Sequence, residues 1–317
     1  MNEIRLARAG QVNWRTHARL GYDRLARGVY GHAPVVPGLD PWTARRAQFF
    51  AHVRAMVSVY RTGAVLYGTT ALQVMGVALP SRLEDWENCH LLVRADAYRP
   101  RRIGVITHTT ATMPPLWNRP TGWPLLHPVD HWLQVGGTQD ELVEVGDGLL
   151  RRQRPLLTLD EFHSRLSELG GTTGVRAARH AAQWVRPGTD SLYETRLRLI
   201  LAHAGLPVPV VNAPVPCPNA GRVYHADLGY PWERLGIEYD GADHVGSRAQ
   251  MAIDAERRRQ LQDAGWLIIT ATVQDLDNPA QFVRSVEQAL ILRRGAHGLM
   301  IGKSGDVSTH IGDHQPG

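Results

Sequence analysis

The chain has 317 residues, enough for two domains that each bury a core. With 43% hydrophobic and 21% charged residues its composition is that of a globular protein, which excludes wholesale disorder. Two cysteines, Cys89 and Cys217, are too few and too separated for a disulfide framework or a zinc site. No apolar run reaches the roughly 20 residues of a membrane span, and the N-terminus lacks a signal-peptide pattern. We therefore expect a cytoplasmic protein with no membrane partner.

The positive charge is unevenly distributed. The net charge is +5, and the cations are 34 arginines and a single lysine, Lys303. Residues 1–188 hold 23 arginines against 15 acids, whereas residues 189–294 hold 11 arginines against 13 acids. A nucleic-acid partner would find most of its phosphate neutralisation in the N-terminal part. A well-solvated arginine-rich surface explains the same charge equally well.

The N-terminal half is predicted to contain two regions. Residues 1–38 read as one or two small helices and a strand that follows Arg27-Gly28, as in a truncated winged helix. In residues 39–188 we expect helices at 43–60, 69–76, 129–136, 140–152, 158–168 and 175–184, and strands at 89–93 and 103–109. This is an α/β region. Arg186-Pro187-Gly188 ends its last helix, and we place a domain boundary there.

The pattern changes after residue 189. We expect a helix at 191–204, extended segments at 208–214, 223–230 and 235–240, a helix at 247–264, a strand at 266–270 and a last helix from Pro279. This order predicts an α/β (α+β) domain with a mixed sheet over residues 189–294. The remaining residues, 295–317, are Gly-rich and polar, and we predict that they are disordered.

Residues 223–240 read as a β-hairpin around a four-residue loop, 231–234. With that loop Tyr230 lies opposite Leu235, and Asp227 therefore lies opposite Glu238. Because side chains alternate along a strand, the two acids share one face, with Cβ atoms about 4.5–5.5 Å apart. A register slip of one residue would separate them.

Two carboxylates held this close raise each other's pKa unless a cation lies between them. Hard oxygen ligands on fixed strands suit Mg²⁺ or Mn²⁺, which take the rest of their shell from water and phosphate. The alternative is an ordinary solvated hairpin face, on which His225 lies opposite Asp240 and balances its charge. Strand alternation alone does not decide between the two.

Several short motifs follow one another through this domain at characteristic spacing. They are Tyr193-Glu194 with Arg198, Gly205-Leu206-Pro207, Ala226-Asp227-Leu228, Ile237-Glu238-Tyr239-Asp240-Gly241 with His244, Asp254 with Arg257, and Gly265-Trp266. Their order resembles the PD-(D/E)XK nuclease superfamily, in its branch related to very-short-patch-repair endonucleases. The resemblance implies a restriction-endonuclease-like fold, a mixed sheet flanked by helices, across residues 189–294.

The resemblance also implies roles for particular residues. Asp227, Glu238 and the Tyr239 carbonyl correspond to ligands of Mg²⁺ or Mn²⁺, in an enzyme that hydrolyses DNA phosphodiester bonds. Glu194 corresponds to an acid that orients a metal-bound water. The segment from Ser191 to Glu194 is also a capping box, and the two roles are compatible.

The chain departs from the family at the lysine. Asp240 stands where the family has that lysine, and Lys303 is too remote to replace it. The repair-endonuclease branch uses histidine instead, which implies His244 as the base or charge stabiliser. Asp240 and Gln250 complete the candidate catalytic set. Three polar residues occur at i, i+4 and i+7 of one helix face, a spacing that an ordinary solvated face also shows: Gln250, Asp254 and Arg257.

The N-terminal half has a looser resemblance, covering residues 1–165. Its motifs are Gly28-Val29-Tyr30, then residues 64–72 (AVLYGTTAL), then residues 145–151 (VGDGLLR). They are similar to the antitoxin, a transcriptional regulator, of abortive-infection toxin–antitoxin systems. The resemblance implies a winged-helix DNA reader followed by an α/β regulatory region.

Three functional hypotheses remain. The first is a Mg²⁺-dependent DNA endonuclease whose basic N-terminal region aids DNA contact. The second is a non-catalytic DNA-binding regulator or antitoxin with an inactive nuclease fold. The third, an antitoxin that binds a toxin or another protein, has the least support. The presence of both Asp227 and Glu238 favours the first hypothesis, and the missing lysine favours the second.

Overall fold

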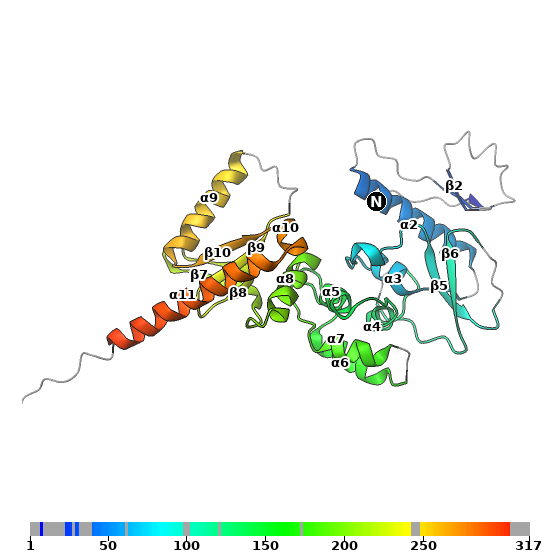
Figure 1. The fold of residues 1–317 in the computed structure, drawn as a ribbon. Helices are drawn as coiled ribbons and strands as arrows, with labels where there is room; N and C mark the ends of the chain where they lie inside the picture. Colours follow the sequence, from blue (N-terminus) through cyan, green and yellow to red (C-terminus); the bar gives the residue numbers. More distant parts are fainter. Residues whose placement is uncertain are drawn as a thin grey trace, which may run out of the picture. The chain divides into compact units, whose positions relative to one another are not determined.

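The structure, a computed structural model, describes residues 7–8, 23–26, 29–31, 40–60, 63–97, 102–119, 122–171, 174–241 and 248–304. The architecture is mixed α/β with small open sheets (Figure 1). The chain divides into two compact units. The first contains residues 1–150 and 154–185, and the second contains residues 151–153 and 186–317. The short segment 151–153 belongs to the second unit although it precedes the predicted boundary at residues 186–188.

The first unit begins with a three-stranded antiparallel sheet. Its strands are β1 (Ala7–Arg8), β2 (Asp23–Ala26) and β3 (Val29–Gly31), and β3 pairs with both of the others. The strand expected after Arg27-Gly28 is therefore present as β3. The prediction of small helices before it is wrong at the described residues, because 7–8 and 23–26 form strands. Residues 9–22 lie outside the described part, so the winged-helix interpretation stays a prediction.

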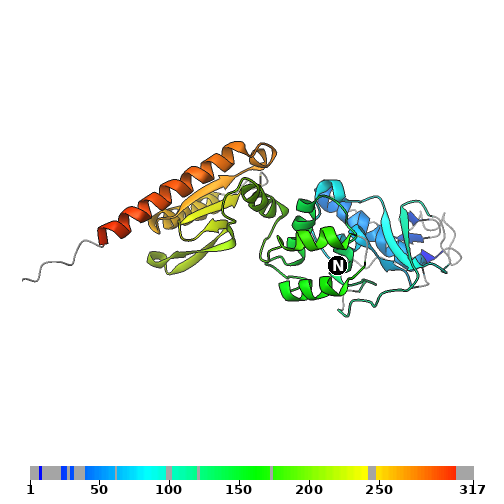
Figure 2. The same ribbon diagram turned by 60° about the horizontal axis from the view of Figure 1, so that its bottom comes forward.

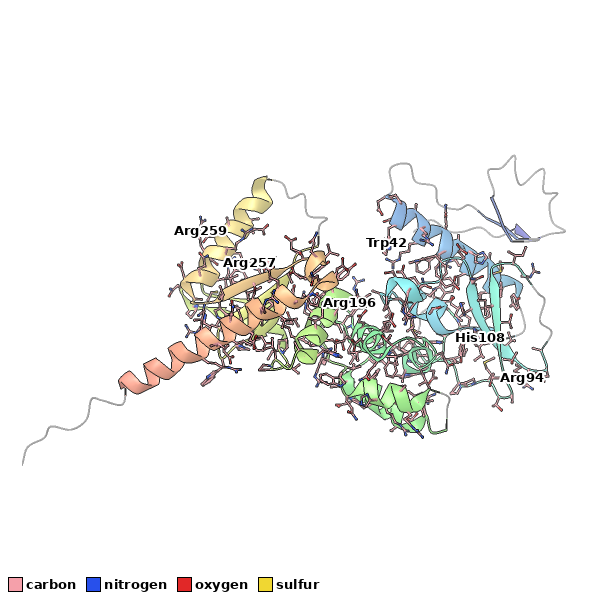
Figure 3. All side chains as sticks on the ribbon, in the orientation of Figure 1. Trp42, Arg94, His108, Arg196, Arg257 and Arg259 are labelled. Atoms are coloured by element: carbon pink, nitrogen blue, oxygen red, sulfur yellow. The ribbon has the colours of Figure 1, made fainter. Side chains whose placement is uncertain are left out.

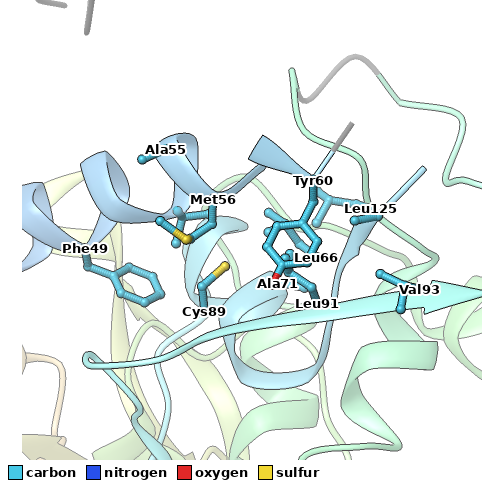
Figure 4. Close-up of a cluster of buried hydrophobic side chains, with 12 residues drawn as sticks. Phe49, Ala55, Met56, Tyr60, Leu66, Ala71, Cys89, Leu91, Val93 and Leu125 are labelled. Atoms are coloured by element: carbon cyan, nitrogen blue, oxygen red, sulfur yellow. The ribbon is translucent and has the colours of Figure 1, made fainter. Parts of the chain in front are cut away.

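A second sheet of the first unit packs against helix α2 (Pro41–Val59). Its strands are β4 (Val65–Leu66), β5 (Cys89–Arg94) and β6 (Val105–Thr110); β5 pairs antiparallel with β4 and parallel with β6. Figure 4 shows the core between them, where Met56 of α2 lies near Cys89 of β5. β6 begins later than predicted, because Gly104 turns the chain with φ +74° and Ile103 is fully exposed.

Short helices complete the first unit. They are α3 (Gly68–Val74), the 3₁₀ turn η1 (Ser81–Leu83), α4 (Pro128–Trp132), α5 (Gln139–Leu149), α6 (Leu159–Glu168) and α7 (Val175–Ala182). α5 begins with a capping box between Thr138 and Glu141. α4 ends at Trp132, before the predicted residue 136: the N–H groups of Gln134 and Val135 donate to carbonyls three residues back, and Gly136 then adopts a positive φ.

The second unit follows the predicted order of elements, with one short helix, α10, added. The elements are α8 (Leu192–His203), β7 (Val210–Cys217), the 3₁₀ turn η2 (Pro218–Ala220), β8 (Arg222–Tyr230), β9 (Leu235–Tyr239), α9 (Arg248–Asp263), β10 (Leu267–Ala271), α10 (Val273–Asp277) and α11 (Ala280–Ser304). The sheet order is β10-β9-β8-β7, with β9 and β10 parallel and the other pairs antiparallel.

Helices cover both faces of this four-stranded sheet (Figure 2). On one face, α8 and α11 pack their apolar side chains against Leu228 and Ile237. On the other face, Leu261 of α9 packs against Ala226 and Trp266. Both layers shield the strands that carry the candidate acids from water.

The prediction of disorder from residue 295 is wrong for residues 295–304, which continue helix α11. Packing of Phe282 and Val286 against the sheet anchors the start of this helix. Once a helix is nucleated, each further residue adds one hydrogen bond, so Gly295 and Gly298 weaken the helix without ending it. Residues 305–317 lie outside the described part of the chain. Within the described part, no helix is both long and apolar enough to cross a lipid bilayer.

Candidate active site

The hairpin of β8 and β9 has the predicted loop and the predicted register. Residues 231–234 form the turn, and the strand pairs run from Tyr230 opposite Leu235 to Leu228 opposite Ile237. The ladder ends there, so Asp227 and Glu238 are the first residues beyond it. Neither further predicted pair belongs to this ladder: Asp227 with Glu238 and His225 with Asp240 lie beyond its last pair.

Side-chain alternation in β8 breaks at Asp227. Leu228 packs in the core under α8 and α11, whereas Ala226 packs in the core under α9. Residues two apart on a regular strand face the same way, so the strand is irregular between them. On the partner strand β7, Asn212 lies between the residues that pair with Ala226 and Leu228, and it has a φ of +50°. The regular side-chain alternation expected from the sequence is therefore interrupted at this point of β8.

Asp227 is partly buried at this irregular point. One carboxylate oxygen, Oδ2, accepts a hydrogen bond of 2.9 Å from the Tyr239 N–H. Burial raises the pKa of Asp227 above its ordinary value, and the nearby charge of Glu238 raises it further, against the lowering effects of the Tyr239 N–H and of Arg257. The two acids therefore interact, as the hairpin register predicts, and burial is the main cause of the raised pKa of Asp227.

Glu194 belongs to the same group of acids. It lies in the first turn of α8, is 7% exposed, and accepts hydrogen bonds of 2.9 Å from the Asp190 N–H and from the Ser191 hydroxyl. The capping interaction expected from the sequence is present in a shifted form, since the carboxylate reaches the N–H of Asp190 rather than that of Ser191. Burial and the charge of Asp227 raise the pKa of Glu194 to about 7.

Arg257 of α9 holds Glu238. Its Nη1 donates to Glu238 Oε2 at 3.2 Å, and its Nη2 donates to the other carboxylate oxygen. Nη2 also donates to the carbonyl of His225 at 3.2 Å, and the guanidinium lies 5.7 Å from the ring centre of Tyr224. These contacts attach α9 to the hairpin at the acid pair. Figure 3 labels Arg257 beside Arg259, which instead pairs with Glu256 on its own helix.

A second arginine near the acids was missed by sequence reasoning. Arg152, from the segment 151–153, donates from Nε to Asp190 Oδ2 at 2.7 Å. Its hydrogen bond with Asp190 raises the pKa of Arg152, and the charges of Glu194 and Asp227 add to this. No motif connects residue 152 with the nuclease-like segment. Only the fold brings this cation to the acids.

The remaining candidates are less closely associated with this group. Asp240 is exposed at the end of β9, where it lines a cavity of about 480 Å³ together with Glu238, Asp254, Arg257 and Arg258. The ring of Tyr239 stacks on Tyr193 of α8 with centroids 4.7 Å apart. His244 and the side chain of Gln250 lie outside the described residues, so their catalytic roles stay predictions.

A divalent cation such as Mg²⁺ needs hard oxygen donors held close together. Among the described side chains, no group of three His, Cys, Asp or Glu is arranged to hold an ion. Two carboxylates, Asp227 and Glu238, interact at the end of the ladder, and burial together with the charge of Glu238 makes the ionised form of Asp227 unfavourable there. Such a pair fits Mg²⁺, which is commonly held by one or two protein carboxylates and completes its shell with water and substrate phosphate. Arg257 would share Glu238 with the ion.

Comparison with known proteins gives only distant relatives. Two uncharacterized proteins of Mycobacterium tuberculosis, MT2308 of strain CDC 1551 / Oshkosh and Rv2248 of strain ATCC 25618 / H37Rv, are each 30% identical to this chain over 138 residues. The match covers 40% of this chain and 51% of each relative. The chain thus spans about half the length of the curated relatives it matches. No family model matches the chain. No solved structure matches it either.

The raised pKa of Glu194 predicts a pH-dependent stability. The folded protein holds this proton up to about pH 7, whereas the unfolded chain releases it near 4.5. The free energy of unfolding contributed by Glu194 is therefore fully present below about pH 4.5 and is lost as pH rises through 7. In metal-free buffer we expect Glu194→Gln to melt at a higher temperature than the wild type at pH 8.5, with a smaller decline between pH 5 and 8.5.

Thermal melts in EDTA at several pH values measure this difference. Glu287→Gln, which changes an exposed glutamate of α11, is the matched control and should follow the wild type. Parallel pH dependence of Glu194→Gln and the wild type would show that Glu194 does not hold a proton at neutral pH.

Proposed function

We propose that the second unit is a metal-dependent DNA endonuclease with a restriction-endonuclease-like fold. The observation that carries the proposal is the group of acids at the end of the β8–β9 ladder. Burial and neighbouring negative charges raise the pKa values of Asp227 and Glu194, and the charge of Glu238 acts on Asp227. Clustered carboxylates of this kind are costly to the fold, and active sites are where such perturbed groups gather. The motif order that resembles the PD-(D/E)XK nucleases supports the same reading.

Each residue has a distinct proposed role. Asp227 and Glu238, with the Tyr239 carbonyl, would hold Mg²⁺ or Mn²⁺; when bound, such an ion polarises the scissile phosphate and makes water more acidic. Glu194 can accept a proton at neutral pH, because its pKa of about 7 matches the working range of a general base. Arg257 places a guanidinium beside Glu238, where it would offset the negative charge of the acids toward a phosphate.

The proposed partner of both units is DNA. The first unit, with the likeness of its sequence to winged-helix antitoxins, would supply DNA contact or regulation through its net positive charge. A toxin or another protein is a further candidate partner, on the strength of that likeness alone.

Cleavage assays test the proposal. Supercoiled plasmid, linear duplex and single-stranded DNA are incubated with the full chain in Mg²⁺, Mn²⁺ or EDTA, beside Asp227→Asn. We expect cleavage of at least one form that requires the metal and is lost in the variant. Equal cleavage by both proteins, or none with any substrate and metal, would contradict the proposal.

One observation favours a second candidate, a DNA-binding regulator with an inactive nuclease fold. Both oxygens of Glu238 are engaged by Arg257, which leaves this acid less available to a cation than Asp227 is. DNA binding without cleavage under all the conditions above would support the regulator.

A further inference from the structure

Helix α2 carries a row of alternating aromatic and guanidinium groups on one side. The row consists of Trp42, Arg46, Phe50 and Arg54, with Trp123 inserted between the last two. Residues four apart on a helix lie on the same side, and twelve residues span about 18 Å. Figure 3 labels Trp42 at the first turn of α2.

The groups of the row contact one another in sequence. The guanidinium of Arg46 lies 5.3 Å from the ring centre of Trp42 and 5.6 Å from that of Phe50. Phe50 and Trp123 have ring centres 6.5 Å apart, and the guanidinium of Arg54 lies 4.7 Å from the ring centre of Trp123. Aromatic rings and guanidinium groups thus alternate along one continuous strip, which we name the α2 strip.

The core of the first unit lies on another side of α2. Phe49, Val53 and Met56 are buried against β5, whereas Trp42 is 55% exposed and Arg54 is exposed. Trp42 therefore contributes little to the packing that holds the helix in place. An exposed tryptophan beside an arginine is a group that a partner can cover.

The charge of the helix is of one sign. Residues 41–59 contain three arginines, Arg45, Arg46 and Arg54, and no acidic residue. The acid at its start, Asp40, accepts hydrogen bonds from the N–H and the hydroxyl of Thr43 and so serves as the helix cap. A polyanion would meet guanidinium groups along the whole strip.

From these observations we propose that the α2 strip binds single-stranded DNA, with arginines on the phosphates and an unpaired base stacked on Trp42. Alternating basic and aromatic groups are the means by which proteins bind single strands without reading their sequence. In a duplex the faces of the bases are stacked on one another. Only the arginines of the strip could then bind the DNA, through its phosphates. This inference rests on the proposed function, because it names single-stranded DNA as the form that the nuclease would meet. It assigns the binding of that form to the first unit.

The test measures binding by the full chain in EDTA, which prevents cleavage. The probe is a fluorescein-labelled 12-nucleotide oligo-dT, followed by fluorescence anisotropy between 50 and 200 mM salt. Trp42→Ala should weaken binding about 5- to 150-fold, the range of one lost base stack, and Trp42→Phe should restore most of it. Arg46→Gln with Arg54→Gln should lower the magnitude of the log–log salt slope by about 1.4, for two lost contacts to a single strand.

A matched control removes the same charge elsewhere in the first unit. Arg176→Gln with Arg179→Gln changes two exposed arginines of α7 and should keep the wild-type affinity and salt slope. Arg46→Lys with Arg54→Lys keeps the charge without the planar groups, so it should keep the slope and lose part of the affinity. Circular dichroism melts identify any variant that has not folded.

Three results would overturn the proposal: equal losses in the α2 and α7 variants, no binding of the oligonucleotide by the wild type, or tighter binding of a duplex of the same length. Binding is measured in EDTA and cleavage in Mg²⁺ or Mn²⁺, so the two properties are measured separately. If the protein binds the oligonucleotide through the α2 strip but cleaves no DNA, only the nuclease proposal is contradicted. If it cleaves DNA but the α2 strip has no part in binding, only this inference is contradicted.

Discussion

Asp227→Asn is expected to lower the rate of metal-dependent DNA cleavage by about 10²- to 10³-fold or more. The substitution keeps the shape of the side chain and its ability to accept the hydrogen bond from the Tyr239 N–H. It removes the charge on which an ion at the acid pair depends. Polarisation of a phosphate by a bound ion contributes several kcal/mol to the transition state, which corresponds to a rate factor of about 10²–10³.

The same substitution should not destabilise the metal-free protein. Burial and the charge of Glu238 make the ionised form of Asp227 unfavourable, so a neutral side chain relieves this cost at neutral pH. We expect the melting temperature in EDTA to stay equal to that of the wild type or to rise. Cleavage kinetics and melts of one preparation measure both effects.

Asp263→Asn is the control for this experiment, since it changes an exposed acid at the end of α9. It should keep the wild-type rate. If Asp227→Asn cleaved as fast as this control, Asp227 would have no part in catalysis.

Arg257→Gln is expected to have opposite effects on metal binding and on stability. Arg257 engages both oxygens of Glu238, so an ion that uses Glu238 must share the carboxylate with it. Without the guanidinium we expect the acid pair to bind Mn²⁺ about tenfold more tightly, the lower end of what a hydrogen bond to a charged group contributes. The contact also anchors α9, so the free energy of unfolding should fall by about 1–3 kcal/mol.

Mn²⁺ titrations followed by electron paramagnetic resonance, together with denaturant melts, separate these effects. Arg259→Gln is the matched control, because its partner Glu256 is exposed on the same helix and such pairs contribute less than about 1 kcal/mol. Arg257→Lys keeps the charge and should lie between the wild type and the glutamine variant. A parallel loss of Mn²⁺ affinity and stability in Arg257→Gln would leave Arg257 with an anchoring role alone.

Much of the second unit follows from local sequence. The loop 231–234 connects two alternating segments, and a four-residue loop leaves one register, in which Tyr230 lies opposite Leu235; the structure has that pairing. The long helix before Gly265 and the strand after it also form as predicted, because periodicity and a turn glycine are local signals. The interaction of Asp227 with Glu238 was predicted on this basis, whereas their function as metal ligands remains a proposal.

Local patterns gave wrong answers where long-range contacts dominate. Residues 295–304 read as a flexible tail, but they extend a helix that packing elsewhere has already nucleated. The short strand β4 and the short helix α10 were missed, since elements of two to five residues form only when a neighbour supplies their hydrogen bonds and burial.

Asp227 and Glu238 show most clearly which properties follow from the sequence and which depend on the tertiary structure. Sequence alone placed Asp227 and Glu238 on neighbouring strands, since residue alternation and loop length are properties of the chain. Only the tertiary structure decided their surroundings: the irregular strand at Asp227, the burial that raises the pKa of Glu194, and the approach of Arg152 and Arg257 from distant segments. Burial and the positions of opposite charges set the protonation of a carboxylate, and both depend on residues that the fold brings near rather than on those beside it in the chain.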